Sequence, residues 1–109
     1  QQHPLDTFWR VGRAVRAHTE PDELVVYRGM DWNPTIPYYA ERRAVANRYN
    51  READDPMVRN EIRLAHSLGN DVGAVVACVL ETRDGEEYGR ALLGRSATCR
   101  TVEGCVVCY

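Results

Sequence analysis

The chain has 109 residues, of which 44% are hydrophobic and 28% are charged, and its formal net charge is −2. These values are typical of a single folded domain, expected over residues 1–109, and they exclude collagen, a coiled coil and a wholly disordered chain. The longest apolar run, residues 74–80, is too short for a bilayer-spanning helix, and the small negative charge argues against nucleic acid as a partner. We therefore expect a globular protein that binds neither membranes nor nucleic acid.

The first half of the chain predicts a helix, a strand, a loop and a second helix, in that order. Apolar residues at helical spacing predict an amphipathic helix over residues 4–18, with arginines on its other side. The apolar run at residues 24–27 predicts a short buried strand. Two prolines make residues 30–37 irregular. Residues 40–53 again carry apolar side chains along one side, which predicts the second helix.

The second half begins with the best-marked helix. Asp55 is a natural N-cap, Pro56 stands at the first helical position, and Gly69 provides the C-terminal stop. Residues 72–80 are rich in β-branched side chains and predict a strand. A turn signal follows at residues 83–85.

The C-terminal stretch has the least regular pattern. Residues 88–93 fit either a helix or a strand, and residues 98–109 predict two short strands around Glu103 and Gly104. The expected fold class is therefore α+β. An N-terminal helix, a short strand and two helices come first, and a C-terminal antiparallel sheet of three or four strands follows.

Four cysteines, many for a small cytosolic domain and few for a disulfide scaffold, leave their chemistry open. They allow three disulfide connectivities, and both a bridge that involves Cys99 and free thiols are compatible with the sequence. The spacing of Cys105 and Cys108 also matches a zinc knuckle. The two valines between them favour a strand, however, which points the thiols to opposite faces, so we expect no metal site.

Two further features bear on the compartment. The chain begins with Gln1 rather than Met, which indicates processing, trimming or a fragment and keeps a secreted origin open. All 14 cationic residues are arginine, so no side-chain amine can be ubiquitinated or acetylated, as would suit a protein that works inside a foreign cell. A GC-rich coding sequence explains the same bias. We favour a secreted or delivered effector over a cytoplasmic protein.

Two stretches carry residues suited to ligand binding. Arg28, at the end of a predicted buried strand and followed by Gly29, places a guanidinium beside open backbone at the rim of a sheet, which suits a phosphate or diphosphate. Pairing of Arg28 with a local carboxylate such as Asp31 is the alternative. Further on, Tyr38 and Tyr39 lead from a loop into a predicted helix, where one ring can lie beside a planar ligand.

Together these stretches resemble the first half of the ADP-ribosyltransferase superfamily. Residues 22–30, Asp-Glu-Leu-Val-Val-Tyr-Arg-Gly-Met, are similar to the strand that supplies the NAD-binding arginine in arginine-type members. Residues 31–34, Asp-Trp-Asn-Pro, followed by Tyr-Tyr-Ala-Glu at residues 38–41, are similar to the RES domain, an NAD-degrading relative of that fold. The resemblance covers residues 24–49, about a quarter of the chain.

The resemblance implies an enzyme, a toxin or effector, that consumes NAD by breaking its nicotinamide–ribose bond. Arg28 and Gly29 would hold the NAD diphosphate, and Tyr38 or Tyr39 would stack on the nicotinamide. The acceptor of the ADP-ribose group would be a protein side chain, a nucleotide or water.

The catalytic glutamate of that family has no matching Glu-any-Glu motif in this chain. Glu103, at the start of a late strand, is the glutamate best placed to stabilise an oxocarbenium-like ribose, with Glu87 and Glu81 as substitutes. The family's serine-threonine-serine strand has its nearest counterpart in Ser-Ala-Thr at residues 96–98, unusually late in the chain.

A protein-binding subunit or inhibitor without catalysis is the alternative function. Trp32, Tyr38 and Tyr39 would then form an interface together with arginines, since aromatic residues and arginine dominate binding energy at protein interfaces. A small secreted, disulfide-bonded toxin subunit is a third interpretation. The enzyme requires Arg28, a tyrosine and a glutamate in one cleft, whereas the interface requires the rings on a flat exposed patch.

Overall fold

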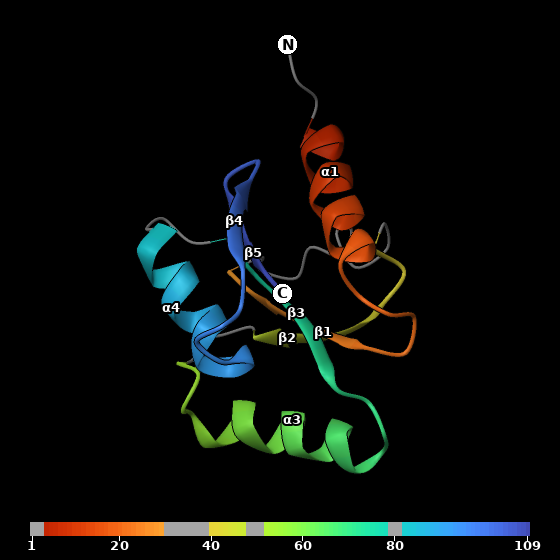
Figure 1. Cartoon of the computed structure of the whole chain (residues 1–109), viewed down its shortest axis with the longest axis vertical. Coiled ribbons are helices and arrows are strands. Elements are labelled where there is room, and N and C mark those ends of the chain that lie inside the picture. Colours follow the sequence, from red (N-terminus) through yellow and green to blue (C-terminus); the bar gives the residue numbers. More distant parts are fainter. Residues whose placement is uncertain (1–3, 30–39, 48–51, 79–81) are drawn as a thin grey trace.

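The computed structural model describes residues 4–29, 40–47, 52–78 and 82–109, and Figure 1 shows their arrangement. The described helices are α1 (Pro4–Ala17), α3 (Pro56–Ser67) and α4 (Thr82–Leu93). One sheet contains the strands β1 (Leu24–Arg28), β2 (Arg43–Asn47), β3 (Val72–Ala77), β4 (Cys99–Val102) and β5 (Cys105–Cys108). These elements confirm the predicted α+β class.

The sheet is mixed, with the strand order β2-β1-β3-β5-β4. β1 runs parallel to both β2 and β3, while β5 runs antiparallel to β3 and β4. The antiparallel part, β3, β5 and β4, agrees with the predicted C-terminal strands, but the parallel strands β1 and β2 belong to the same sheet, so the sheet is not purely antiparallel as predicted. β1 lies between two neighbours and its first four residues are buried, as expected for a parallel strand with both faces covered.

Helices cover both faces of the sheet (Figure 1). On one face, Val11 and Val15 of α1 are fully buried in a cluster that includes Val25, Tyr27 and Val107. On the other face, α4 contributes to a second cluster through Tyr88, which is packed with Val26, Val75 and Val106. Alternate residues of β1 therefore belong to different clusters, because successive side chains of a strand point to opposite faces.

At Gly85 and Gly89 the backbone of α4 lies too close to the sheet for a side chain to fit between them. A Cβ atom on Gly85 would lie 2.8 Å from Val106 Cγ2 and 3.3 Å from Ala77 Cβ. One turn later, a Cβ on Gly89 would lie 2.7 Å from Cys108 Cβ. The predicted turn at residues 83–85 is therefore wrong. The glycine that produced that turn signal is instead required by contact between helix and sheet.

The prediction of a second helix over residues 40–53 is also wrong. The structure has β2 there, which pairs in parallel with β1 so that Val45 is the partner of Val26. Just before β2, Arg42 donates hydrogen bonds to the hydroxyl and the carbonyl of Thr19, at 3.0 and 3.1 Å, next to the end of α1. These interactions connect residues that are distant in sequence, so side-chain spacing alone predicted the wrong element.

The α3 helix begins and ends as predicted. The Asp55 carboxylate accepts a hydrogen bond from the backbone N–H of Met57 at 2.9 Å, which satisfies one of the free donors of the first turn. Gly69, just beyond the helix, has a φ of 86°, in the left-handed region that favours glycine. None of the helices in the described part of the chain has the length and apolar character of a membrane span.

All four cysteines form disulfides, one between Cys78 and Cys105 and one between Cys99 and Cys108. Cys99 and Cys108 are direct partners in the ladder of β4 and β5, and Cys78 follows β3 beside the first residue of β5. The alternatives of a zinc site or free thiols are therefore wrong, because each sulfur is bonded to another sulfur. The expected bridge that involves Cys99 is confirmed.

Candidate functional site

An open groove of about 520 Å³ lies at the carboxyl end of β1. In the chain, β1 is followed by β2, which is its neighbour on one side of the sheet. Its neighbour on the other side, β3, is followed by α4 and then by β4 and β5, which lie beyond β3. In open sheets, ligands bind outside the carboxyl ends of neighbouring parallel strands whose connections diverge in this way. The lining residues come from the end of β1, the segment that enters α3, α3 itself and α4: Arg28, Glu52, Ala53, Asp54, Arg59, Asp84, Glu87, Tyr88 and Ala91.

Arg28 is the most enclosed of the ion-paired groups in the groove. Its side chain is 12% exposed, whereas that of its partner Glu52 is 75% exposed. The Arg28 guanidinium donates a hydrogen bond from Nη2 to Glu52 Oε1 at 3.2 Å. Since one partner of this ion pair is largely in water, the pair stabilises the fold by about 1 kcal/mol or less. A ligand anion can therefore replace Glu52 on Arg28 at low cost.

The ring of Tyr88 holds the Arg28 side chain in place. Tyr88 is 3% exposed, and the centre of its ring lies 4.7 Å from Arg28 Cζ, in a cation–π arrangement. Such contacts contribute about 0.5–2 kcal/mol. Because α4 positions Tyr88, the orientation of the guanidinium at the end of β1 depends on the contact between α4 and the sheet.

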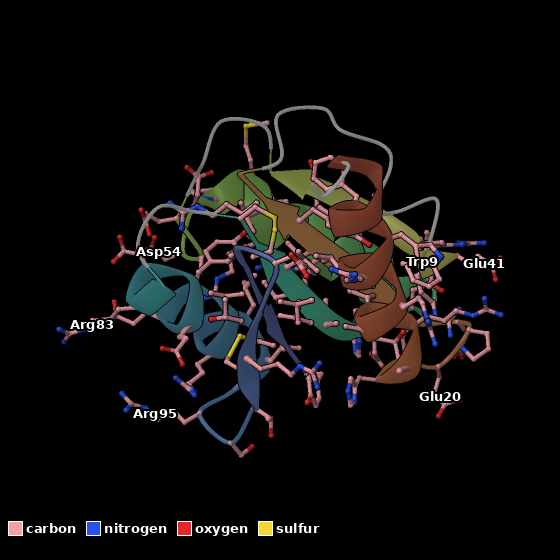
Figure 2. The ribbon with its side chains drawn as sticks, turned by 90° about the horizontal axis from the view of Figure 1, so that it is seen from above. Trp9, Glu20, Glu41, Asp54, Arg83 and Arg95 are labelled. Atoms are coloured by element: carbon pink, nitrogen blue, oxygen red, sulfur yellow. A yellow bond between two sulfur atoms is a disulfide. The ribbon has the colours of Figure 1, made fainter. Side chains whose placement is uncertain are left out.

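The groove combines both signs of charge. Two arginines, Arg28 and Arg59, share it with four carboxylates, those of Glu52, Asp54, Asp84 and Glu87. In Figure 2, Asp54 lies on the α4 side of the molecule, while Trp9 and Glu41 lie on the α1 side. This mixture suits a ligand that carries an anionic part and a cationic part, because each part can lie near the opposite charge.

Two of the site residues predicted from the sequence come together in this groove. Arg28 and Glu87 both line it, although they are far apart in the chain and belong to β1 and α4. Glu87 accepts a hydrogen bond from Arg83 Nε at 3.2 Å, within the same helix. Gly29 follows Arg28 and has a φ of 80°, so a residue with a side chain would be strained there.

Glu103 lies away from the groove. It forms, with Gly104, the turn between β4 and β5, and both residues have positive φ, 50° and 84°. Its carboxylate accepts a hydrogen bond from Arg10 Nη1 of α1 at 2.8 Å. The structure therefore groups Arg28 with Glu87 rather than with Glu103. The other predicted residues, Tyr38, Tyr39 and the substitute Glu81, lie outside the described residues.

Several groove residues were missed by the sequence reasoning: Glu52, Asp54, Arg59, Asp84 and Tyr88. Tyr88 and Asp84 lie on α4, which was not predicted as a helix because Gly85 contributed to a turn signal. Glu52 and Asp54 lie in the segment before α3. A helix was predicted up to residue 53, and no binding role was assigned to this segment. The structure shows why they reach the groove: α3 follows the parallel strand β2, which brings the residues before α3 to the carboxyl edge of the sheet.

Tyr27 belongs to the opposite face of β1 and takes no part in the groove. Its side chain is packed among the residues beneath α1, and its hydroxyl has no hydrogen-bond partner within the described part of the chain. Burial raises the pKa of the Tyr27 phenol, and the nearby Arg42 guanidinium only partly opposes this effect. Tyr27 is therefore a neutral core residue at physiological pH.

Within the described residues, no group of three His, Cys, Asp or Glu side chains is arranged to hold a metal ion. Comparisons with protein-family models, with curated proteins and with solved structures gave no match.

Proposed function

We propose that this protein is an ADP-ribosyltransferase-like enzyme that binds NAD in the Arg28 groove and breaks the nicotinamide–ribose bond. The observation that carries the proposal is the presence of Arg28 and Glu87 in a single groove. An arginine and a carboxylate from separate elements are the two groups that this chemistry requires. The resemblance of residues 24–49 to that superfamily supports the same activity.

The charges of NAD match those of the groove. NAD carries an anionic diphosphate and a cationic nicotinamide ring, and the groove contains both arginines and carboxylates. In the proposed mode, the Arg28 guanidinium donates hydrogen bonds to the diphosphate and displaces the exposed Glu52 carboxylate. Such charge-assisted hydrogen bonds are about twice as strong as neutral ones.

Glu87 is the carboxylate that we assign to the chemical step. When the bond between ribose C1′ and the nicotinamide nitrogen breaks, its electron pair leaves with neutral nicotinamide, and positive charge develops on the ribose. The Glu87 carboxylate stabilises that charge. The oxygen of water, or a nucleophile of an acceptor protein, then forms the new bond to C1′ and gives up its proton to solvent.

The two disulfides are consistent with a protein that folds in an oxidising compartment, as secreted proteins do. We infer that the enzyme is exported and acts as a toxin or effector on a protein acceptor.

The test is NAD binding by calorimetry and nicotinamide release by chromatography, with two substitutions and a matched control for each. Arg28→Ala is expected to weaken NAD binding by about 10- to 100-fold, since hydrogen bonds to a charged group are lost. Arg95→Ala is its control, because Figure 2 shows Arg95 projecting from the surface outside the groove.

Glu87→Gln is expected to retain NAD binding and to lower nicotinamide release by about 100-fold or more. Its control is Glu86→Gln, on the same helix, where the carboxylate pairs with Arg90 and does not line the groove. Unchanged release in Glu87→Gln would contradict the assigned carboxylate. The absence of NAD binding by the unsubstituted protein would contradict the function itself.

A binding subunit without catalysis is the second candidate, and an exposed aromatic–arginine pair favours it. Trp9 of α1 is 41% exposed, and Arg13 Cζ lies 4.7 Å from the centre of its ring. Such pairs are common in interface centres. The absence of both NAD binding and nicotinamide release would favour this candidate over the enzyme.

A further inference from the structure

The two disulfides lie on opposite faces of the sheet. Cys78 and Cys105 belong with the cluster beneath α1, whereas Cys99 and Cys108 belong with the cluster beneath α4. Both bridges hold β5, one to the end of β3 and one to β4. The Cys99–Cys108 bridge is therefore the one that shares a face with the groove.

The backbone of α4 lies directly on the Cys99–Cys108 bridge. A Cβ on Gly89 would collide with the Sγ atom of Cys108 and would lie 3.8 Å from the Sγ atom of Cys99. Cys108 is fully buried, so its sulfur is not in contact with solvent. Tyr88, immediately before Gly89, and Glu87 line the groove. The bridge thus lies at the contact between the sheet and α4, the helix that supplies four of the nine lining residues of the groove.

Reduction changes the space that these two sulfurs need. Sulfur atoms of two thiols cannot remain at bonding distance and must separate to van der Waals distance, and each gains a hydrogen. Protein interiors are close-packed, so added volume at a buried site displaces its neighbours. One neighbour at this position is the α4 backbone at Gly89, which has no side chain that could rearrange.

We propose that the Cys99–Cys108 disulfide is a redox-sensitive latch on the α4 wall of the groove, which a dithiol reductant releases. One thiolate of the dithiol attacks the sulfur of Cys99, the less buried residue of the pair, the bond to Cys108 Sγ breaks, and Cys108 leaves with the electron pair and takes up a proton. The second thiol of the reductant then displaces Cys99, so that the protein gains two thiols and the reductant becomes a disulfide. The displaced α4 carries Tyr88 away from Arg28.

The functional consequence, loss of ligand binding in the reduced protein, rests on the proposed function, but the movement of α4 does not. The test therefore measures hydrogen exchange of α4 amides without any ligand, before and after treatment with dithiothreitol. Two variants, each with one bridge left, separate the two disulfides: Cys78→Ala/Cys105→Ala keeps the latch, and Cys99→Ala/Cys108→Ala removes it.

Dithiothreitol is expected to accelerate exchange of α4 amides by about tenfold or more in the variant that keeps Cys99–Cys108, with β1 amides unchanged. In the variant that keeps only Cys78–Cys105, the same treatment is expected to leave α4 exchange unchanged. If one variant does not fold, stepwise reduction of the unsubstituted protein, with the remaining bridge identified by mass, gives the same comparison.

Equal exchange of α4 before and after reduction of Cys99–Cys108 would overturn the latch. Faster exchange of α4 amides after reduction of Cys78–Cys105 alone would overturn the latch as well. Faster α4 exchange in a protein that never releases nicotinamide would leave the latch standing and refute the proposed function, so the two failures can be distinguished.

Discussion

The helices α3 and α4 differ in how they are held, although each has 12 residues. α3 has strong local signals, an aspartate cap and a proline in its first turn, but Val58 is its buried residue and Leu64 and Leu68 are 63% and 71% exposed. α4 lies so close to the sheet that Gly85 and Gly89 leave no space for a side chain.

Strong local helix signals, as in α3, and close contact with the sheet, as in α4, therefore need not occur in the same helix. The features that made α3 easy to predict act within one or two turns of the chain. The features that hold α4 involve residues of β3 and β5, and they require glycines that weaken the helix locally. The groove depends on the second kind of helix, because α4 supplies Tyr88 and Glu87.

The largest expected effect is that of Gly89→Ala. Helix propensity predicts that this change stabilises α4 by about 1 kcal/mol. The contact with Cys108 predicts the opposite sign, and we expect overpacking to lower the free energy of unfolding by about 1–3 kcal/mol. Urea unfolding measures the difference.

Two controls accompany Gly89→Ala. Ala91→Gly, at an exposed position of the same helix, is expected to cost about 1 kcal/mol from propensity alone. In a Cys99→Ala/Cys108→Ala background, the cost of Gly89→Ala is expected to fall because the sulfurs are absent. Stabilisation by Gly89→Ala in the unsubstituted protein would mean that α4 does not lie as close to the sheet as described.

The intermediate effect is that of Asp55→Ala, which removes the cap of α3. The N–H of Met57 then loses its acceptor, and the expected loss in the free energy of unfolding is about 1 kcal/mol. Asp54→Ala, one residue earlier and exposed, is expected to change it by less than about 0.5 kcal/mol. Equal losses from the two substitutions would show that the cap does not hold α3.

The smallest effect is expected from the outer face of α3. Leu64→Gln replaces an exposed side chain by another good helix former, and stability should change by less than about 0.5 kcal/mol. Val58→Ala, on the inner face, should cost about 1–2 kcal/mol because buried methyl groups are lost. A cost for Leu64→Gln as large as that for Val58→Ala would show that Leu64 is covered in solution.

Two of the predicted site residues, Arg28 and Glu87, line the groove. Arg28 was recognisable because a polar group at the end of a buried strand must lie at the rim of a sheet. Glu87 was named only as a substitute for Glu103, since nothing local distinguishes two glutamates before the helices are placed. Glu103 instead occupies a tight turn with positive φ and pairs with Arg10.

Local features of the sequence were enough to predict the α+β class, the ends of α1 and α3, the buried character of β1 and the short C-terminal hairpin. Each follows from caps, periodicity or turn residues within a few positions of one another. Three features became clear from the structure alone: residues 43–47 form a strand, α4 lies on the sheet through two glycines, and the cysteines pair as Cys78–Cys105 and Cys99–Cys108. These features depend on contacts between residues far apart in the chain, and such contacts leave no periodic trace in the sequence.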